Sequence, residues 1–320
     1  HYISSDANVK AQVLDDFRTH ISGYESPESL GPLWRSLAHD KSVVSGIALE
    51  FEVDEDFLVA ELLPLLIAQY QNNFIDSVDL HYVELLTRDY QSNLPPSAVT
   101  EIAQYAKKRY QKFIRETDSY LRLETVILSS RKHLPEFVPA TDKAGVARYR
   151  DYLQRSSDIA ALQLLIGSYM KLHTLPGQIA TLADYAKARY GEFLKQIDHL
   201  ASLEKVIGSY AKHLAVHGEE LDGIAANRYE KLIAEVGDAG NLEVLIASYS
   251  SRLPAHGDQL GQSAQSAYAI LLDQSPDLAA LESRIASYHE HLPEHVSPLD
   301  QVSANRYEKL IAEVGDAGNL

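Results

Sequence analysis

The apolar residues between positions 221 and 236 recur every three or four residues, which is the spacing of one face of an α-helix. Residues 239–253 repeat that spacing, so the pattern predicts two amphipathic helices in succession. We expect Gly237 to end the first helix in the left-handed conformation, and Asp238 to cap the second by accepting from its exposed amides. Pro254 has no amide hydrogen and ends the second helix. The segment is therefore predicted to be a helical hairpin of about 39 residues. Its apolar positions are Leu221, Ile224, Ala225, Tyr229, Leu232, Ile233 and Val236, then Leu242, Leu245, Ile246, Tyr249 and Leu253.

Tyrosine shows that this hairpin is repeated along the chain. The sequence has 19 Tyr and a single Trp, and most of the Tyr fall into two series. The first-series tyrosines recur once per predicted hairpin at a nearly constant interval, at Tyr70, Tyr110, Tyr149, Tyr190, Tyr229, Tyr268 and Tyr307. The second-series tyrosines follow their partners by about half that interval, at Tyr90, Tyr169, Tyr210, Tyr249 and Tyr288, with Ser130 replacing one. We interpret both series as structural repeat positions.

Other residue types keep the same interval. Arg precedes a first-series tyrosine at Arg109, Arg148, Arg189, Arg228 and Arg306. Asp recurs in the stretch before each second-series position, at Asp79, Asp118, Asp158, Asp198, Asp238 and Asp277. Glu recurs closer to that position at Glu84, Glu124, Glu204, Glu243 and Glu282, with Gln163 departing, and Leu-Pro follows it at Leu94, Leu134, Leu253 and Leu292. The Arg series could form an anion-binding stripe. We favour a structural role, in which each Arg pairs with a Glu of this series across a helix interface while the Tyr packs and hydrogen-bonds.

A single hairpin cannot bury both of its apolar faces, but stacked hairpins can. The sequence therefore predicts an all-α fold, a right-handed α-solenoid of tandem two-helix repeats with a period of about 39 residues. Residues 61–320 hold six hairpins and a truncated seventh. The pattern resembles the two-helix solenoid class of HEAT and TPR proteins over three quarters of the chain. The period and the Arg-Tyr and Ser-Tyr positions match neither consensus, so the resemblance is one of class only.

Residues 305–320 repeat residues 227–242 without a change, two repeat intervals later. Such identity indicates a recent or an engineered duplication. Because the chain starts at His1 rather than Met and stops where the next helix should begin, we expect it to be a fragment of a longer repeat protein.

Residues 1–60 do not keep the interval and are predicted to form an irregular N-terminal capping region. Residues 9–21 and 27–39 have helical spacing, and we expect Trp34 to belong to the core of this capping region. Residues 46–53 alternate apolar and polar side chains as a β-strand does, but a lone strand has no partner in an all-helical chain.

Composition and charge exclude several classes. With no Cys, the chain has no disulfide, thiolate nucleophile or Cys-ligated zinc. A net charge of −16 opposes binding to nucleic acid and anionic lipid. Neither a membrane span nor a signal peptide is visible, so we expect no membrane insertion and a soluble protein, cytoplasmic or secreted.

One pattern suggests metal chemistry. His291, Glu294 and His295 match the H-x-x-E-H motif of zinc peptidases, with His289 beside them. That motif requires a continuous helix, and Pro293 interrupts it. The histidines also recur with the repeat, at His133, His213 and His291 and at His217, His256 and His295. We therefore expect a structural role, no metal and no other cofactor.

The basic middle of the chain is the best candidate for binding a partner. Residues 101–200 carry 16 basic and 11 acidic side chains, whereas the flanking segments are strongly acidic. The candidate partner-binding residues are Lys107, Lys108, Lys112, Arg115, Arg122, Arg131 and Lys132. An acidic run at residues 50–56 is a weaker candidate, for a basic partner.

These observations favour a non-enzymatic protein–protein interaction module or scaffold, part of a longer protein such as a bacterial effector or toxin. One alternative is the scaffold region of a larger enzyme whose catalytic domain lies elsewhere. A second alternative is nucleic-acid binding through the basic middle repeats, although no nucleic-acid-binding motif is present. The sequence does not identify the partner or the oligomeric state.

Overall fold

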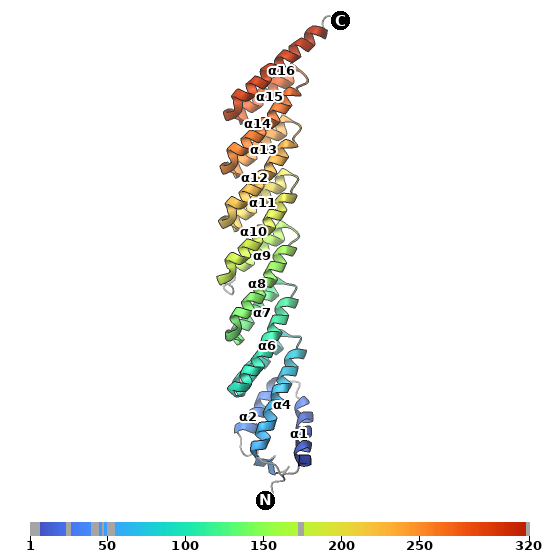
Figure 1. Ribbon diagram of the computed structural model, residues 1–320, viewed down its shortest axis with the longest axis vertical. Coiled ribbons are helices and arrows are strands. Elements are labelled where there is room, and N and C mark those ends of the chain that lie inside the picture. The colour runs from blue at the N-terminus through green and yellow to red at the C-terminus, as the bar shows by residue number, and fades with distance from the viewer. Residues whose placement is uncertain are drawn as a thin grey trace. The chain divides into compact units, whose positions relative to one another are not determined.

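The computed structural model describes residues 7–23, 27–39, 45–46, 48–49, 55–171 and 176–317, and all regular structure in these residues is helical. Neighbouring helices pack in pairs, which confirms the predicted all-α class (Figure 1). The chain divides into two compact units. The first unit comprises residues 1–152 and 171–178, and the second comprises residues 153–170 and 179–320.

In the first unit, helices α4, α5, α6 and α7 pack on one another, and α1 and α2 cover α4 and α5. Gly31 of α2 marks a close approach to α5, because a Cβ there would clash with the side-chain amide of Asn93. Trp34 is buried, as predicted. The elements are α1 (Ala7–Ser22), α2 (Pro27–His39), α4 (Glu55–Asp76), α5 (Leu80–Asn93), α6 (Pro96–Glu116), α7 (Tyr120–His133), the 3₁₀ turn η1 (Pro135–Phe137), most of α8 (Val138–Arg155) and the 3₁₀ turn η2 (Pro176–Gln178).

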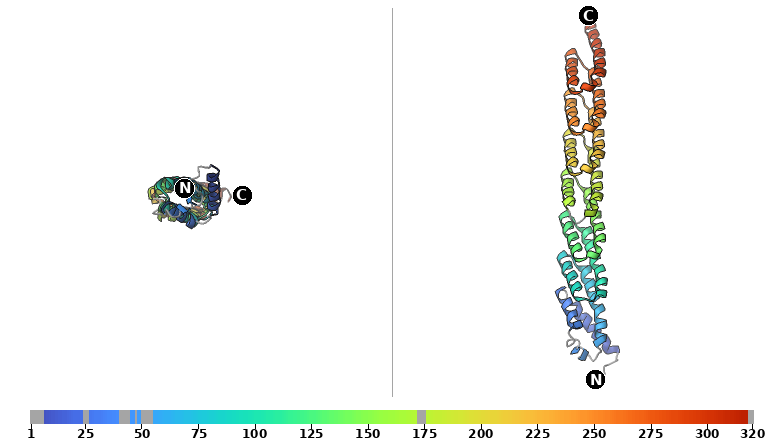
Figure 2. Two further views of the ribbon diagram at one scale, coloured as in Figure 1. Left: turned by 90° about the horizontal axis from the view of Figure 1, so that it is seen from below. Right: turned by 90° about the vertical axis from the view of Figure 1, so that its left-hand side faces the viewer.

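From α10 to α16 in the second unit, each helix packs on its neighbour and on the next but one. The helices α10, α12, α14 and α16 therefore form one layer, and α11, α13 and α15 form another (Figure 2). The elements are α9 (Ile159–Lys171), α10 (Ile179–Gln196), α11 (Leu200–His213), η3 (Ala215–His217), α12 (Gly218–Ala234), α13 (Ala239–Arg252), η4 (Pro254–His256), α14 (Gly257–Asp273), α15 (Leu278–His291), η5 (Pro293–His295) and α16 (Val296–Ala317).

Local sequence accounts for most helix boundaries. The predicted cap forms at Asp238, whose carboxylate accepts from the Asn241 amide at 2.8 Å. Asp79, Asp158 and Asp277 accept from backbone amides in the same way. The Leu-Pro pairs end the second helices, and Pro135, Pro254 and Pro293 each open a short 3₁₀ turn that leads into the next helix.

One local prediction is wrong. Gly237 does not adopt the left-handed conformation, and α12 ends at Ala234 rather than near Val236. Hydrogen bonds from Glu235 N to Lys231 O and from Val236 N to Ile233 O tighten the last turn instead. The chain then reaches α13 through the extended backbone of its N-cap.

The strand pattern of residues 46–53 is also not realised where the structure describes it. Gly46, Ala48 and Leu49 are helical, whereas residues 47 and 50–53 lie outside the described residues. The described part of the chain holds no strand that could satisfy the backbone groups of another.

The core is built from paired tyrosine rings. Tyr229 and Tyr249 meet edge to face at 6.2 Å between ring centroids, and both are buried. The same T-shaped contact joins Tyr70 to Tyr90, Tyr190 to Tyr210 and Tyr268 to Tyr288, at 6.1 to 6.3 Å. The constant spacing between the two tyrosine series thus places an aromatic pair inside each of these helix pairs.

We predict that Tyr229→Ala lowers the stability of α12 and α13 by about 3–5 kcal/mol, because it removes a buried ring from a packed interface. Tyr307→Ala is the matched control, since Tyr307 precedes the same residues but is only partly buried. Its cost should be about 1 kcal/mol. Chemical denaturation combined with amide hydrogen exchange measures both, and equal costs would contradict the placement of Tyr229.

Candidate interaction site

Three of the first-series tyrosines, Tyr110, Tyr229 and Tyr268, carry a hydrogen-bonded relay that links three helices. The Tyr229 hydroxyl on α12 lies 2.6 Å from Ser248 Oγ on α13, and Ser248 donates to Glu204 on α11 at 2.6 Å. Since the serine hydroxyl donates its one proton to the carboxylate, it accepts from the tyrosine. We call this arrangement the Tyr–Ser–Glu relay.

The relay recurs in both units. Tyr110, Ser129 and Glu84 form it in the first unit, with 2.9 Å between the hydroxyls and 2.5 Å to the carboxylate. Tyr268, Ser287 and Glu243 form it in the second. Where Gln163 replaces the Glu, its amide donates to Ser209 at 2.7 Å, and Ser209 contacts Tyr190. The recurring polar residues thus serve contacts between helices.

Burial keeps these tyrosines protonated, although the hydrogen bond to the relay serine lowers the pKa of Tyr110 and Tyr229. Burial raises the pKa of the Tyr110 phenol to about 12, with the charge of Glu84 adding to the effect. Burial likewise raises the pKa of Tyr249 to about 12 and that of Tyr229 above its ordinary value. Such phenols are hydrogen-bond donors at neutral pH and do not act as bases.

The hydroxyls of the second-series tyrosines have less regular hydrogen-bond partners. Tyr210 and Tyr288 each donate to an aspartate of the following helix, Asp222 and Asp300, at 2.6 Å. Ser130, which replaces a tyrosine, bonds Thr141 at 2.9 Å. The hydroxyls of Tyr90 and Tyr169 are buried without a hydrogen-bond partner among the described residues.

The predicted Arg–Glu pairing is wrong where the Arg contacts are defined. Arg148 Nε donates to the Thr117 carbonyl at 3.0 Å, and Arg189 donates to the Ser156 carbonyl at 2.6 Å. Arg306 donates twice to the Ser275 carbonyl, at 3.0 and 2.7 Å. These carbonyls follow the ends of α6, α8 and α14, where a helix leaves carbonyls unpaired and its dipole favours a cation. Glu84, Glu204 and Glu243 accept from the relay serines instead, and Glu124 and Glu282 accept directly from Tyr149 and Tyr307.

The histidines of the H-x-x-E-H motif do not converge. Pro293 opens η5, so the motif spans a helix end and a 3₁₀ turn. His291 lies 3.9 Å from Glu243, His289 lies 3.1 Å from Asp300, and His295 bonds Gln265 at 2.8 Å. No three metal-ligating side chains come together in the part of the chain that the structure describes.

Three of the candidate partner-binding cations form one stripe. Lys108, Lys112 and Arg115 lie on α6 at intervals of four and three residues, which places them on one helix face. Lys108 Nζ lies over the Tyr105 ring, Lys112 approaches Glu116 at 3.9 Å, and Arg115 donates to a carbonyl of its own helix. We call these three residues the α6 stripe.

The other candidates lie apart from one another. Lys107 is partly buried, with Nζ 4.8 Å from the Phe137 ring centre. Arg131 is used internally, in a bidentate bond to Asp142 at 2.6 to 3.0 Å. Arg122 and Lys132 are exposed near opposite ends of α7, about 15 Å apart along the helix axis. The structure therefore does not gather all seven residues into one site.

Two further sequence features can be placed only in part. Of the acidic run at residues 50–56, residues 50–54 lie outside the described residues, and Asp56 is exposed in the first turn of α4. No helix in the described ranges is long and apolar enough to span a bilayer.

The sequence analysis singled out Arg228 as one of the Arg series but did not place Lys195 and Lys231 beside it. Lys195, Arg228 and Lys231 line one hollow between α10 and α12. The sequence contained a signal for this group. Aligning the two identical segments, which lie two repeat intervals apart, places Lys195 opposite Asp273, so a cation stands where the later repeat has a carboxylate.

Comparisons with known proteins do not assign the chain to a family. No protein-family model matches it, and no curated protein matches it. One solved structure, from work described as computational design of self-assembling cyclic protein homooligomers, aligns over 96% of this chain and 99% of that chain. Its identity is 12% and its TM-score is 0.12, so this likeness carries no argument about fold or function.

We predict that Ser248→Ala destabilises the second unit by about 1–3 kcal/mol, because it leaves the Tyr229 hydroxyl and the Glu204 carboxylate without their shared partner. Ser266→Ala is the control: Ser266 is exposed and bonds only a carbonyl of its own helix, so the change should fall within about 0.5 kcal/mol. Urea denaturation of both variants provides the test. Equal decreases in the urea midpoint of the two variants would show that the relay does not contribute to stability beyond an exposed hydroxyl.

The first unit should lose stability on acidification through His133. Burial lowers the pKa of this imidazole, and Lys132 and Arg88 lower it further while Glu84 opposes them. The unfolded chain therefore binds a proton at higher pH than the folded one, so this contribution is present above about pH 6.5 and is lost as the pH falls through the folded pKa. The stability of His133→Gln, measured by denaturation from pH 7 to 5, should fall less steeply than that of the unchanged protein. Parallel curves would show that His133 does not contribute.

Proposed function

We propose that this protein is a non-enzymatic protein–protein interaction module, built as a right-handed α-solenoid of hairpins that repeat about every 39 residues. The recurrence of the Tyr–Ser–Glu relay in both units supports the repeat architecture, because the same three-helix contact reappears at the sequence interval. The layered packing of α10 to α16 is consistent with stacked hairpins.

The observation that carries the proposed function is that two groups of polar residues have different surroundings: one group makes contacts between helices, and the other is exposed. Those that recur with the repeat contact one another between helices, as Tyr229, Ser248 and Glu204 do. The three cations of the α6 stripe occur together in this repeat alone, although Lys231 and Lys309 share the repeat position of Lys112, and the stripe lies on the outer face of its helix. In a repeat protein, side chains that vary between repeats are the ones available to distinguish partners.

The chemistry of the α6 stripe favours an acidic protein surface. Its three cations lie on one helix face, and the contacts described above are made within α6 itself. Exposed charges of this kind act mainly on the rate and orientation of association. The acidic segments on either side of the basic middle would repel an extended nucleic acid, which makes protein the favoured partner.

The proposal predicts that Lys108→Glu/Lys112→Glu abolishes capture of at least one acidic protein from native lysate by the immobilised chain, as identified by mass spectrometry. Lys205→Glu/Lys212→Glu carries the same charge change on the exposed surface of α11 and should leave that capture unchanged. Binding should also weaken as salt rises.

Three outcomes would favour other readings. Identical captured proteins for both double variants would remove the α6 stripe from the function. Retention of RNA or DNA on filters at low salt, lost in Lys108→Glu/Lys112→Glu, would favour nucleic-acid binding. Catalytic activity of the longer protein that depended on this region would favour the role of an enzyme scaffold.

A further inference from the structure

The chain contains an internal comparison, because two helices share a sequence but face different neighbours. Residues 227–234 of α12 are identical to residues 305–312 of α16. Within the same unit, α12 packs on α10, and α16 packs on α14. The opposite helix is therefore one source of any difference in how the shared side chains are satisfied.

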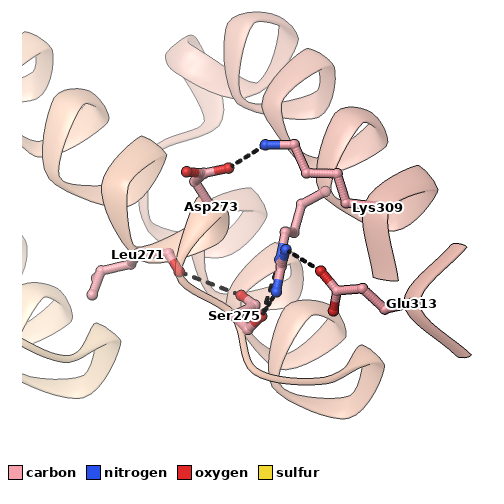
Figure 3. A network of polar contacts seen from close by, with 6 residues as sticks. Leu271, Asp273, Ser275, Lys309 and Glu313 are labelled. Carbon is pink, nitrogen blue, oxygen red and sulfur yellow. Dashed lines mark hydrogen bonds and ion pairs between the residues drawn. The ribbon is translucent and has the colours of Figure 1, made fainter. Parts of the chain in front are cut away.

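On α16 the shared cations are paired. Lys309 lies 2.9 Å from the carboxylate of Asp273 at the end of α14 (Figure 3). Arg306 donates to the Ser275 carbonyl and lies 3.3 Å from Glu313. This face of α16 is close to electrically balanced.

On α12 the corresponding cations face a third cation. Lys195 of α10 stands at the position equivalent to Asp273 and lines one hollow with Lys231, whereas Lys309 pairs with Asp273. Arg228 Nε is buried without a hydrogen-bond partner among the described residues, whereas the equivalent atom of Arg306 is bonded.

These residues surround a hollow, which we call the α10–α12 hollow. Its lining consists of Lys195, Ile224, Asn227, Arg228 and Lys231. Its volume is about 130 Å³, or about four water molecules. Helix α12 is held close to α10 there, since a Cβ on Gly191 would lie 3.3 Å from Ile224 Cδ1.

The carboxylates nearby do not neutralise all three charges. Glu192 pairs with Arg189, Glu220 pairs with Lys187, and Glu230 accepts from Gln259. The hydrogen bond with His199 is the main cause of the lowered pKa of Asp198, and the charge of Arg228 contributes to it. The lining of the hollow itself contains three cations and no carboxylate, so the hollow is positive.

We propose that the α10–α12 hollow binds a single oxyanion group, a carboxylate or a phosphate, held by Lys195, Arg228 and Lys231. The Arg228 guanidinium supplies directed hydrogen bonds and the two lysines supply charge, while the Asn227 amide can donate at the rim. A bound oxyanion would take the place that Asp273 holds at the equivalent position. The site lies in the second unit and does not depend on the α6 stripe.

The test is a titration of the isotope-labelled chain with inorganic phosphate, and separately with acetate, at constant ionic strength, followed by amide chemical shifts. Saturable shifts confined to residues near 195 and 227–231 are expected. Lys195→Asp, which copies the Asp273–Lys309 pair, should weaken binding by about tenfold or more without loss of folding. Lys212→Asp makes the same charge change on the exposed surface of α11 and should keep the affinity within about twofold.

A reciprocal variant gives a second readout. Asp273→Lys removes the carboxylate from Lys309 and should create a new phosphate response at residues 305–309. Binding of both probes would identify a site open to carboxylates, and binding of phosphate alone would restrict it to phosphate groups. Absence of saturable shifts with both probes, or an unchanged affinity in Lys195→Asp, would overturn the proposal.

Discussion

The buried hydrogen bond between a tyrosine and a serine, passed on to a glutamate of the preceding helix pair, is the contact on which the structure depends. Tyr229, Ser248 and Glu204 belong to three different helices, so no helix pair satisfies the relay alone. An unpaired hydroxyl or carboxylate in this interior would be costly, and the relay therefore favours one arrangement of neighbours. The edge-to-face ring contact of Tyr229 with Tyr249 fixes the spacing of the pair.

Sequence spacing predicted the elements but not all their contacts. Side-chain periodicity specified the helical hairpin, and the Asp238 cap follows from local chemistry. The partner of each Arg was not predictable, because the acceptors are backbone carbonyls. Every residue has such a carbonyl, so residue type does not indicate which one accepts. The positions of the candidate cations show the same limit: periodicity places Lys108, Lys112 and Arg115 together, but nothing in the pattern revealed that Arg131 is taken up by Asp142.

The two identical segments show how far local sequence decides structure. Residues 235–238 form the end and turn of α12, whereas residues 313–316, with the same four side chains, continue α16 as a helix. The local sequence therefore permits both conformations, and the packing of α13 on α12 and α14 accompanies the turn. The same pair of segments shows that the charge environment of Lys231 and Lys309 is set by the opposite helix. Repetition preserves the relay while changes between repeats, such as Lys195 for Asp273, alter the surface.

The most direct test of this account is a double-mutant cycle between Tyr229 and Glu204, which lie on different helices and are joined through Ser248. The free energy of unfolding would be measured for Tyr229→Phe, Glu204→Ala and the double variant. If the relay connects successive helix pairs, the two changes are non-additive by about 0.5–3 kcal/mol. Additive effects would show that the two residues act independently and would contradict the central claim.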